Sequence, residues 1–412
     1  MVRDLSHNIP CYGVHKLGFW NCFLPTFDGY SCSGTSTSPN IMNTLTTSRS
    51  AYQSYMISPR LYFITYQYSP DDASIGQGIV PKLVSPDLAL GTFCHEVCGA
   101  VMGGGSEEDN VKKQTDIWND LAHTRGFDSP FNPDMLLALA QGLSKAWIRN
   151  RLPQIEKDYE ILAVEQEREL SIHDDDLQLL IPTRLDGELR NKFSGTYHAL
   201  EMKTTRTKRS YYFDKYNYDI QTLQHLWTIE NTYGPDSCHS ILMEFLYKGY
   251  GLDSGATWYS PFVRAFVKHG VPPFDKTEYE VEGKFARRKD WNVFNVWEEF
   301  TQDEWYKLIG GAKLDGQLLN MAIVRSNTEL PDFQFQMFEA HKRIAEGLSQ
   351  WVGTTDPLER RVILNRYFPL AYHSYDKHLI GFNPEQALES GDYLIREPHH
   401  ALERKLLANK TQ

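Results

Sequence analysis

The sequence predicts an α/β fold in which a small mixed sheet is flanked by helices. Two helical segments with clear start signals come first, three strand-like segments follow them, and an amphipathic helix comes next. Helices before and after a run of strands are typical of a layered α/β structure. With 412 residues, 41% of them hydrophobic and 13% aromatic, the chain is long enough to bury a core around such a sheet.

The first two helices are predicted from their ends and from their apolar spacing. Ser85-Pro86 provides a cap and a first-turn proline for a helix over Leu88–Met102, which Gly103-Gly104-Gly105 ends. Asn132-Pro133 starts the second helix in the same way. Its apolar residues recur at the spacing of one buried face, so we expect it to pack on the sheet; they are at positions 136, 139, 140, 143 and 147.

The strands are predicted from apolar and β-branched runs that turn residues separate. We expect one strand over Ile161–Ile172 and a second over Leu177–Leu189. A turn at Asn191–Gly195 then returns the chain into a third strand over Tyr197–Thr205. The helical spacing of the apolar residues in Tyr218–Tyr233 predicts an amphipathic helix directly after this sheet.

These elements suggest three parts of the chain. Residues 1–50 are an irregular extension rich in Ser, Thr, Gly and aromatics, and residues 51–250 hold the predicted α/β core. Residues 251–412 are expected to be an extension packed on that core, with a helix over Asp332–Val352. The chain has no internal repeat.

Three residues at the predicted hairpin form a candidate catalytic cluster. Alternate side chains of a strand share a face, so Glu201 and Lys203 project together while Leu200 and Met202 point to the core. Asp186 lies on the neighbouring strand, and the short connection lets the two strands pair. Two carboxylates and an ammonium are therefore expected to meet at one point.

Such a cluster suits phosphodiester hydrolysis, which needs oxygen ligands for a hard divalent cation and positive charge near the phosphorus. The carboxylates would hold the cation and the ammonium would stabilise developing charge. The segment 203–215 carries five basic residues and one acid although the net charge of the chain is -11. Its Arg206, Lys208 and Arg209 are candidates for binding DNA phosphate.

Alone, a triplet of this kind is common as ordinary ion pairing on an exposed strand. Its neighbours favour the functional interpretation, because Gly187 follows the aspartate and a helix opens on Gln221 after the basic segment. The sequence gives less support to two other kinds of metal site. His95-Glu96 lacks the second histidine of a zinc-protease helix, and Asp174-Asp175-Asp176 lacks the spacing of a calcium loop and is better explained as a turn.

The chain resembles the PD-(D/E)XK nuclease superfamily, specifically its RecB-like branch, which includes phage exonucleases and CRISPR adaptation nucleases. The resemblance covers about residues 50 to 250 and implies a restriction-endonuclease-like core. The matching pieces are Gly91-Thr92-Phe93-Cys94-His95-Glu96, Arg184-Leu185-Asp186-Gly187, Leu200-Glu201-Met202-Lys203-Thr204-Thr205 and Asp219-Ile220-Gln221.

Carried over to these positions, the resemblance implies a metal site and its chemistry. It implies that Lys203 is catalytic and that Gln221 orients the substrate or the lysine. Mg2+ or Mn2+ would be the cofactor, and an imidazole ligand suits Mn2+ well. The implied metal ligands are His95, Asp186 and Glu201, with Glu165 as a further acidic position.

Two positions depart from the family pattern. The tyrosine often found four residues after the glutamine is His225 here. Many members also hold an iron-sulfur cluster with four cysteines, but Ser58-Pro59-Arg60 replaces the first cysteine segment and Phe368–Phe382 has no cysteine. We therefore expect no iron-sulfur cluster and direct packing between these segments. Cys94 and Cys98, four apart on a helix, are best explained as small buried residues.

These features together predict a metal-dependent DNA nuclease, an exonuclease acting in recombination, repair or phage DNA processing. An endonuclease, or a nuclease-like subunit that only binds DNA, is the alternative. DNA and a single-strand-annealing or other recombination protein are the expected partners, and the oligomeric state is left open. No run of about 18 apolar residues and no secretory leader is present, so we expect a cytoplasmic protein without membrane contact.

Overall fold

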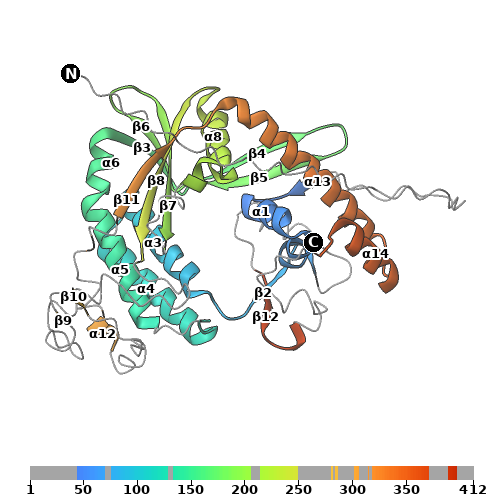
Figure 1. The fold of residues 1–412 in the computed structure, drawn as a ribbon, viewed down its shortest axis with the longest axis horizontal. Coiled ribbons are helices and arrows are strands. Elements are labelled where there is room, and N and C mark those ends of the chain that lie inside the picture. Colours follow the sequence, from blue (N-terminus) through green and yellow to red (C-terminus); the bar gives the residue numbers. More distant parts are fainter. Residues whose placement is uncertain are drawn as a thin grey trace, which may run out of the picture. The chain divides into compact units, whose positions relative to one another are not determined.

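The computed structural model describes residues 44–69, 76–128, 133–205, 214–248, 280–281, 284–285, 301–305, 314, 318–370 and 388–396. These residues form a mixed α/β fold, which confirms the predicted class (Figure 1). None of the described helices is long and apolar enough to cross a membrane.

A five-stranded mixed sheet lies at the centre of the fold. Its strand order is β11-β8-β7-β6-β3, in which β7 and β8 are parallel and the other neighbours antiparallel. The C-terminal third supplies the edge strand β11, so the expected division at residue 250 cuts through this sheet. The strands are β3 (Tyr159–Val164), β6 (Gly187–Asn191), β7 (Tyr197–Thr205), β8 (Cys238–Tyr247) and β11 (Leu318–Ile323).

Helices cover both faces of this sheet, and the alternation of strand residues explains why. On β7, Leu200 and Met202 enter the core formed with α3 (Pro86–Met102) and α5 (Pro133–Asn150). Ala199 belongs to the core on the other face, where α8 (Ile220–Tyr233) packs. The expected burial of Leu200 and Met202 is confirmed, and each face of the sheet has its own core.

The predicted helices are confirmed close to their expected bounds. α3 begins after the N-cap Ser85, and all five spaced apolar residues of α5 are buried. A helix that was not predicted, α4 (Glu107–Thr124), lies between them and is capped by Ser106. Its sequence is highly charged and buries only Gln114 and Trp118, so its apolar pattern is weak. The short α6 (Leu152–Asp158) leads into β3.

Two continuous strands were expected where the chain forms four. The predicted strand over Ile161–Ile172 divides into β3 and β4 (Glu167–His173), and the one over Leu177–Leu189 divides into β5 (Gln178–Arg184) and β6. β3 and β6 belong to the central sheet, whereas β4 and β5 pair in a second sheet. The first break falls in the wholly polar stretch Glu165–Glu169, so the alternation is lost there. Leu185 and Leu189 continue the apolar pattern across the second break, which therefore does not reveal that the chain changes sheet.

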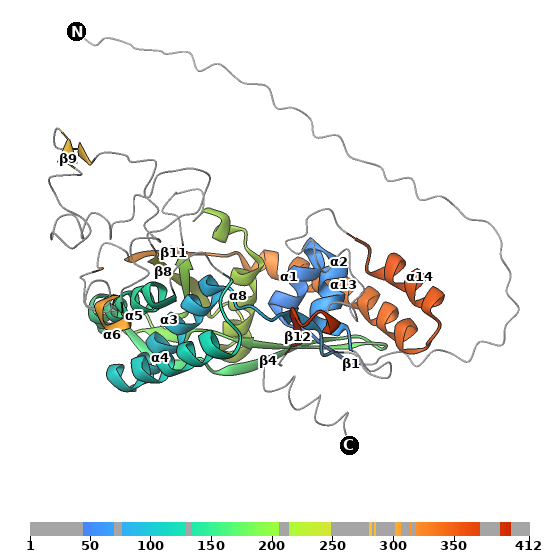
Figure 2. The same ribbon diagram turned by 90° about the horizontal axis from the view of Figure 1, so that it is seen from below.

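The second sheet and its helices enclose a second core. Its strand order is β1-β5-β4, with β1 parallel to β5. Helices from both ends of the described chain meet over it, as the view from below also shows (Figure 2). The predicted C-terminal helix is confirmed as α13. The elements are β1 (Thr44–Thr46), α1 (Arg49–Ile57), α2 (Pro59–Tyr62), a π-helix (Phe63–Gln67), α13 (Leu330–Val352) and α14 (Pro357–Tyr367).

Two segments stand where many RecB-like nucleases carry the cysteines of an iron-sulfur cluster, and these segments contact each other directly. Arg60 donates to the carbonyl of Phe368 at 2.8 Å and to Oδ1 of Asn365 at 3.0 Å. The ring of Phe63 packs against that of Phe368 with 4.8 Å between centroids. The expected direct packing is therefore confirmed for these residues, while residues 371–382 lie outside the described part.

The structure also tests the predictions for the two cysteines of α3 and for the acidic turn at Asp174. Cys94 and Cys98 are free, fully buried thiols that face α5. Asp174 accepts hydrogen bonds from the backbone N–H groups of Asp176 and Leu177 in the β4–β5 turn, which confirms the turn.

The remaining elements are small. They are β2 (Ile79–Pro81) with β12 (Tyr393–Ile395), β9 (Glu280–Val281) with β10 (Lys284–Phe285), and α12 (Gln302–Trp305).

Gly347 of α13 lies directly against Tyr367 of α14, and it provides a test of the second core. A Cβ there would lie 2.6 Å from Cβ of Tyr367, so Gly347→Ala must push the helices apart. We expect the free energy of unfolding in urea to fall by about 1 to 3 kcal/mol. Gln336→Ala, exposed on the same helix, should change it by less than about 0.5 kcal/mol. An unchanged Gly347→Ala variant would contradict this packing.

His341 makes the stability of the second core sensitive to acid. Its Nδ1 donates to the carbonyl of Met337 at 2.7 Å, and the Thr47 hydroxyl donates to Nε2 at 2.8 Å. Burial lowers the pKa of His341 from 6.5 to about 4. The unfolded chain therefore binds more protons in this interval, and stability is full above pH 6.5 and falls towards pH 4.

We expect this histidine to account for about 3 kcal/mol of acid destabilisation. The measurement is urea unfolding across this pH interval in wild type and in His341→Gln, whose side chain does not titrate. The loss on acidification should be smaller in the variant, and parallel pH profiles would refute the role of His341.

Candidate metal centre

Three potential metal donors meet where α3 approaches the junction of β3 and β6. His95, Glu165 and Asp186 each offer one donor atom, and these atoms all lie within 4.8 Å of one another. Nδ1 of His95 is 3.2 Å from Oδ1 of Asp186. Two carboxylates and an imidazole form a donor set that suits a divalent cation.

A glycine of α3 lets the helix come close enough to deliver His95. Gly99 lies one turn after the histidine, on the side that faces the sheet. A Cβ at Gly99 would lie 3.2 Å from Cγ of Glu165, so a larger residue would press on this carboxylate. The segment Gly91–Gly99 of α3 thus supplies the donor His95, and Gly99 leaves room for the side chain of Glu165.

The backbone of Glu165 has a conformation that residues other than glycine rarely adopt. Its backbone φ is 49°, in the left-handed region, where β3 ends and the chain leaves for β4. Nε of Arg184 lies 2.8 Å from its Oε2. Backbone strain of this kind is a feature of functional sites, and here it turns the carboxylate towards His95 and Asp186.

Asp186 occupies the second break, between β5 and β6. Its Oδ2 accepts the backbone N–H of Met202, while Oδ1 faces His95. The carboxylate therefore joins β7 to α3. The next acid, Glu188, has other partners, since it is buried and pairs with Arg168 at 2.9 Å and Tyr233 at 2.7 Å. The break before β6 therefore separates the contacts of these two carboxylates.

The charges in the group are strongly interdependent. Burial, and then the negative charge of Asp186, raise the pKa of Glu165 to about 7. Burial also disfavours the charged form of Asp186, but His95 and Lys203 outweigh it and bring the pKa to about 2. Burial opposes protonation of His95, and Asp186 outweighs that effect, so its pKa is raised. A divalent cation would relieve the repulsion between the two carboxylates, which fits this donor set.

Glu201 lies beside this group but belongs to a different set of contacts. Lys203 and Gln221 both bind its Oε1, and Nε2 of His225 lies 3.3 Å from its Oε2. Glu201 is not part of the group of donors within 4.8 Å, whereas Glu165 is. The structure thus brings Glu201, Lys203 and Gln221 together as expected, with both carboxylate oxygens engaged by protein side chains.

His225 is a site residue whose role was not recognised from the sequence. It is 4% exposed, and its Nδ1 has no hydrogen-bond partner in the described part of the chain. Its position four residues after Gln221 places both side chains on one face of α8. That spacing is the signal in the sequence for placing His225 at the site.

The start of α8 is fixed by the C-terminal third of the chain. Arg325, which follows β11, donates to the carbonyl of Asp219 at 3.2 Å and to the Thr222 hydroxyl at 2.7 Å. Asp219 is the N-cap of α8, and its side chain accepts from the N–H of Gln221. A residue about 100 positions away in the sequence therefore positions Gln221, which no local pattern indicates.

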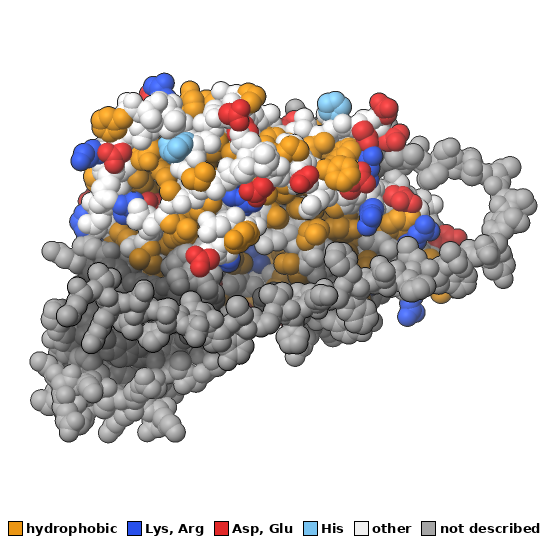
Figure 3. Space-filling view, turned by 45° about the horizontal axis from the view of Figure 1, so that its top comes forward, with side chains coloured by type: hydrophobic (Ala, Val, Ile, Leu, Met, Phe, Trp, Pro, Cys, Tyr) orange, Lys and Arg blue, Asp and Glu red, His pale blue; other side chains and the backbone are white. Residues whose placement is uncertain are grey.

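The proposed phosphate-binding residues Arg206, Lys208 and Arg209 lie outside the described residues. On the face in Figure 3, acidic and basic side chains are interspersed among hydrophobic and polar ones. Neither sign dominates the described part of that face, so charge complementarity to a nucleic acid would depend on local groups near the site.

Comparison of the sequence with protein-family models and with curated proteins gave no match.

Binding of Mn2+ tests the donor group without reference to any activity. We expect the affinity measured by isothermal titration calorimetry to fall at least about tenfold in both Asp186→Asn and Glu165→Gln, because each removes a charged donor. Glu160→Gln, on the same strand β3 but 46% exposed and paired with Arg190, should bind as wild type does. Equal affinity in all four proteins would exclude a metal centre here.

Proposed function

We propose that this protein is a divalent-metal-dependent deoxyribonuclease. The observation that supports this is the placement of the donors His95, Glu165 and Asp186 next to the Lys203–Glu201 pair. In metal-dependent phosphodiester hydrolysis a cation held by oxygen and nitrogen donors and a positively charged side chain beside it can act together on the phosphate.

Each component has a distinct part in the proposed reaction. When bound by the donor group, Mg2+ or Mn2+ supplies positive charge to a phosphate oxygen and acidifies water. The side chain of Lys203 is 24% exposed and its ammonium is paired with Glu201, so it can contact a substrate while its position stays fixed. It orients the attacking water and stabilises negative charge that develops on the phosphate. Gln221 and His225 keep the carboxylate of Glu201 in place.

We further propose that the central sheet and its helices form a restriction-endonuclease-like core. The mixed strand order, the histidine from α3 on one face and the glutamine from α8 on the other support this arrangement. The resemblance to RecB-like nucleases then favours cleavage from DNA ends in recombination or repair, beside a single-strand-annealing or other recombination protein. A DNA-binding subunit without catalysis remains an outcome that experiment decides.

Substitution of Lys203 tests the catalytic assignment. We expect Lys203→Ala to lower kcat on labelled duplex and single-stranded DNA with Mg2+ or Mn2+ by about a hundredfold or more, because charge stabilisation in the transition state is lost. DNA binding should persist. Lys192→Ala, at the opposite end of the β6–β7 hairpin, is the matched control and should retain full activity. Cleavage that survives in both Lys203→Ala and Asp186→Ala would refute this site.

The preference for DNA ends is tested by comparing linear DNA with covalently closed circular DNA. An exonuclease degrades only the linear form, since the circle offers no end. Cleavage of the circle identifies an endonuclease, and binding of both forms without cleavage identifies a binding subunit.

A further inference from the structure

A cationic side chain lies on the α8 side of the site, and it has no anionic partner in the described part of the chain. Arg49 is the first residue of α1, and it is partly buried. Its Nη1 donates to Oε1 of Gln53 at 3.2 Å, a neutral contact within the same helix. The charge of the guanidinium is therefore not neutralised by this contact.

The position of Arg49 in α1 is electrostatically unfavourable. The N-terminal end of a helix carries a partial positive charge, which favours acids in the first turn. The first turn of α1 contains no acid, and Ser48 caps it through a neutral hydroxyl that accepts from the N–H of Ala51. Two sources of positive charge thus coincide, an arrangement that an anion would stabilise. Departures from local rules of this kind are expected at functional sites.

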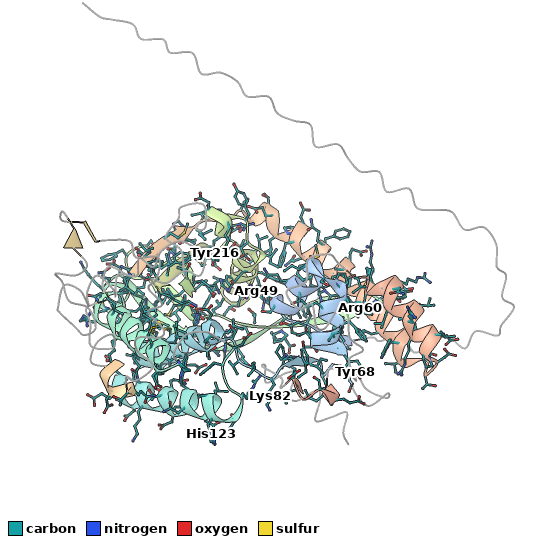
Figure 4. The ribbon with its side chains drawn as sticks, turned by 60° about the horizontal axis from the view of Figure 1, so that its bottom comes forward. Arg49, Arg60, Tyr68, Lys82, His123 and Tyr216 are labelled. Atoms are coloured by element: carbon teal, nitrogen blue, oxygen red, sulfur yellow. The ribbon has the colours of Figure 1, made fainter. Side chains whose placement is uncertain are left out.

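Arg49 lies close to the site described above. α1 packs against α8, and Arg49 is at the end of α1 nearest α8 (Figure 4). Burial first, and then the charges of Lys203 and Arg49, lower the pKa of His225, so the guanidinium is within electrostatic range of that ring. The same ring contacts Glu201. Arg49 therefore flanks the site from the side opposite α3, which supplies His95.

The α8 side also contains a buried polar atom that has no protein partner in the described residues. This is Nδ1 of His225, a residue that is only 4% exposed. Buried polar atoms in proteins are nearly always hydrogen-bonded, so an unpaired one calls for a further group such as a water molecule or a ligand. The atom belongs to the ring whose pKa is lowered first by burial and then by charges that include Arg49, so it lies in the same region as the guanidinium.

We infer that Arg49, together with the first turn of α1, binds a backbone phosphate of the nucleic-acid strand beside the cleavage position. A guanidinium can engage two phosphate oxygens at once, and Gln53 restricts its orientation. The inference rests on the proposed nuclease function and adds a substrate contact to it. Arg49 binds substrate, and the reacting groups remain those of the donor group and Lys203.

The test compares Arg49→Gln and Arg49→Lys with wild type and with Arg361→Gln, an exposed arginine on α14. Cleavage is measured at several DNA concentrations, and DNA binding is measured by fluorescence anisotropy in EDTA over a range of salt. We expect Arg49→Gln to raise KM and Kd about tenfold with kcat within about twofold, and to reduce the salt slope by about one phosphate contact. Arg49→Lys should retain the salt slope, and Arg361→Gln should match wild type.

The outcomes separate this inference from the proposed function. An Arg49→Gln variant with unchanged KM, Kd and salt slope, in a protein that does cleave DNA, overturns the inference alone. A loss of kcat at unchanged KM overturns it too. If wild type binds DNA without cleaving and Arg49→Gln weakens binding with the smaller slope, the phosphate contact stands and the nuclease proposal fails. If wild type neither binds nor cleaves, both fail. Thermal unfolding of each variant verifies that it is folded.

Discussion

The carboxylate of Asp186 is the interaction on which the candidate site depends. One oxygen accepts from the backbone of Met202 on β7 and the other faces His95 of α3, so a single side chain connects the sheet to the helix on its face. Such a contact requires the chain to leave regular strand pairing just before β6. The break between β5 and β6 is therefore part of how the site is built, because a side chain of a continuous strand projects from a face of the sheet and away from the backbone N–H groups of the neighbouring strand.

The site combines two groups with opposite electrostatic character. The donors around Asp186 are partly buried and concentrate negative charge, and burial first and then the charge of Asp186 raise the pKa of Glu165 to about 7. Beside them, Glu201 is saturated by an ammonium, an amide and an imidazole. A cation bound by the first group would leave the contacts of the second unchanged. The separation allows neighbouring carboxylates to differ in role, with the proposed metal binding in one group and the positioning of Lys203 in the other.

The second core supports the site from outside the central sheet. Arg325 fixes the N-terminal end of α8, and α1 packs against the same helix. Both contacts bring together residues that are distant in the sequence. The C-terminal third thus helps to determine the position of Gln221 and closes the second core through Arg60 and Phe368. Its contribution to the proposed activity is structural, since the donors all come from the N-terminal 250 residues.

The sequence by itself determined the features that depend on local periodicity and capping. It located α3 and α5, the turn before β7, and the strand on which Glu201 and Lys203 share a face. These follow from interactions between residues a few positions apart, which leave a direct pattern. Only the tertiary structure decided that Glu165 joins the donors, that His225 holds Glu201 and that β11 completes the sheet. Those outcomes depend on the direction in which the chain leaves each strand and on contacts between distant segments, which local periodicity does not specify.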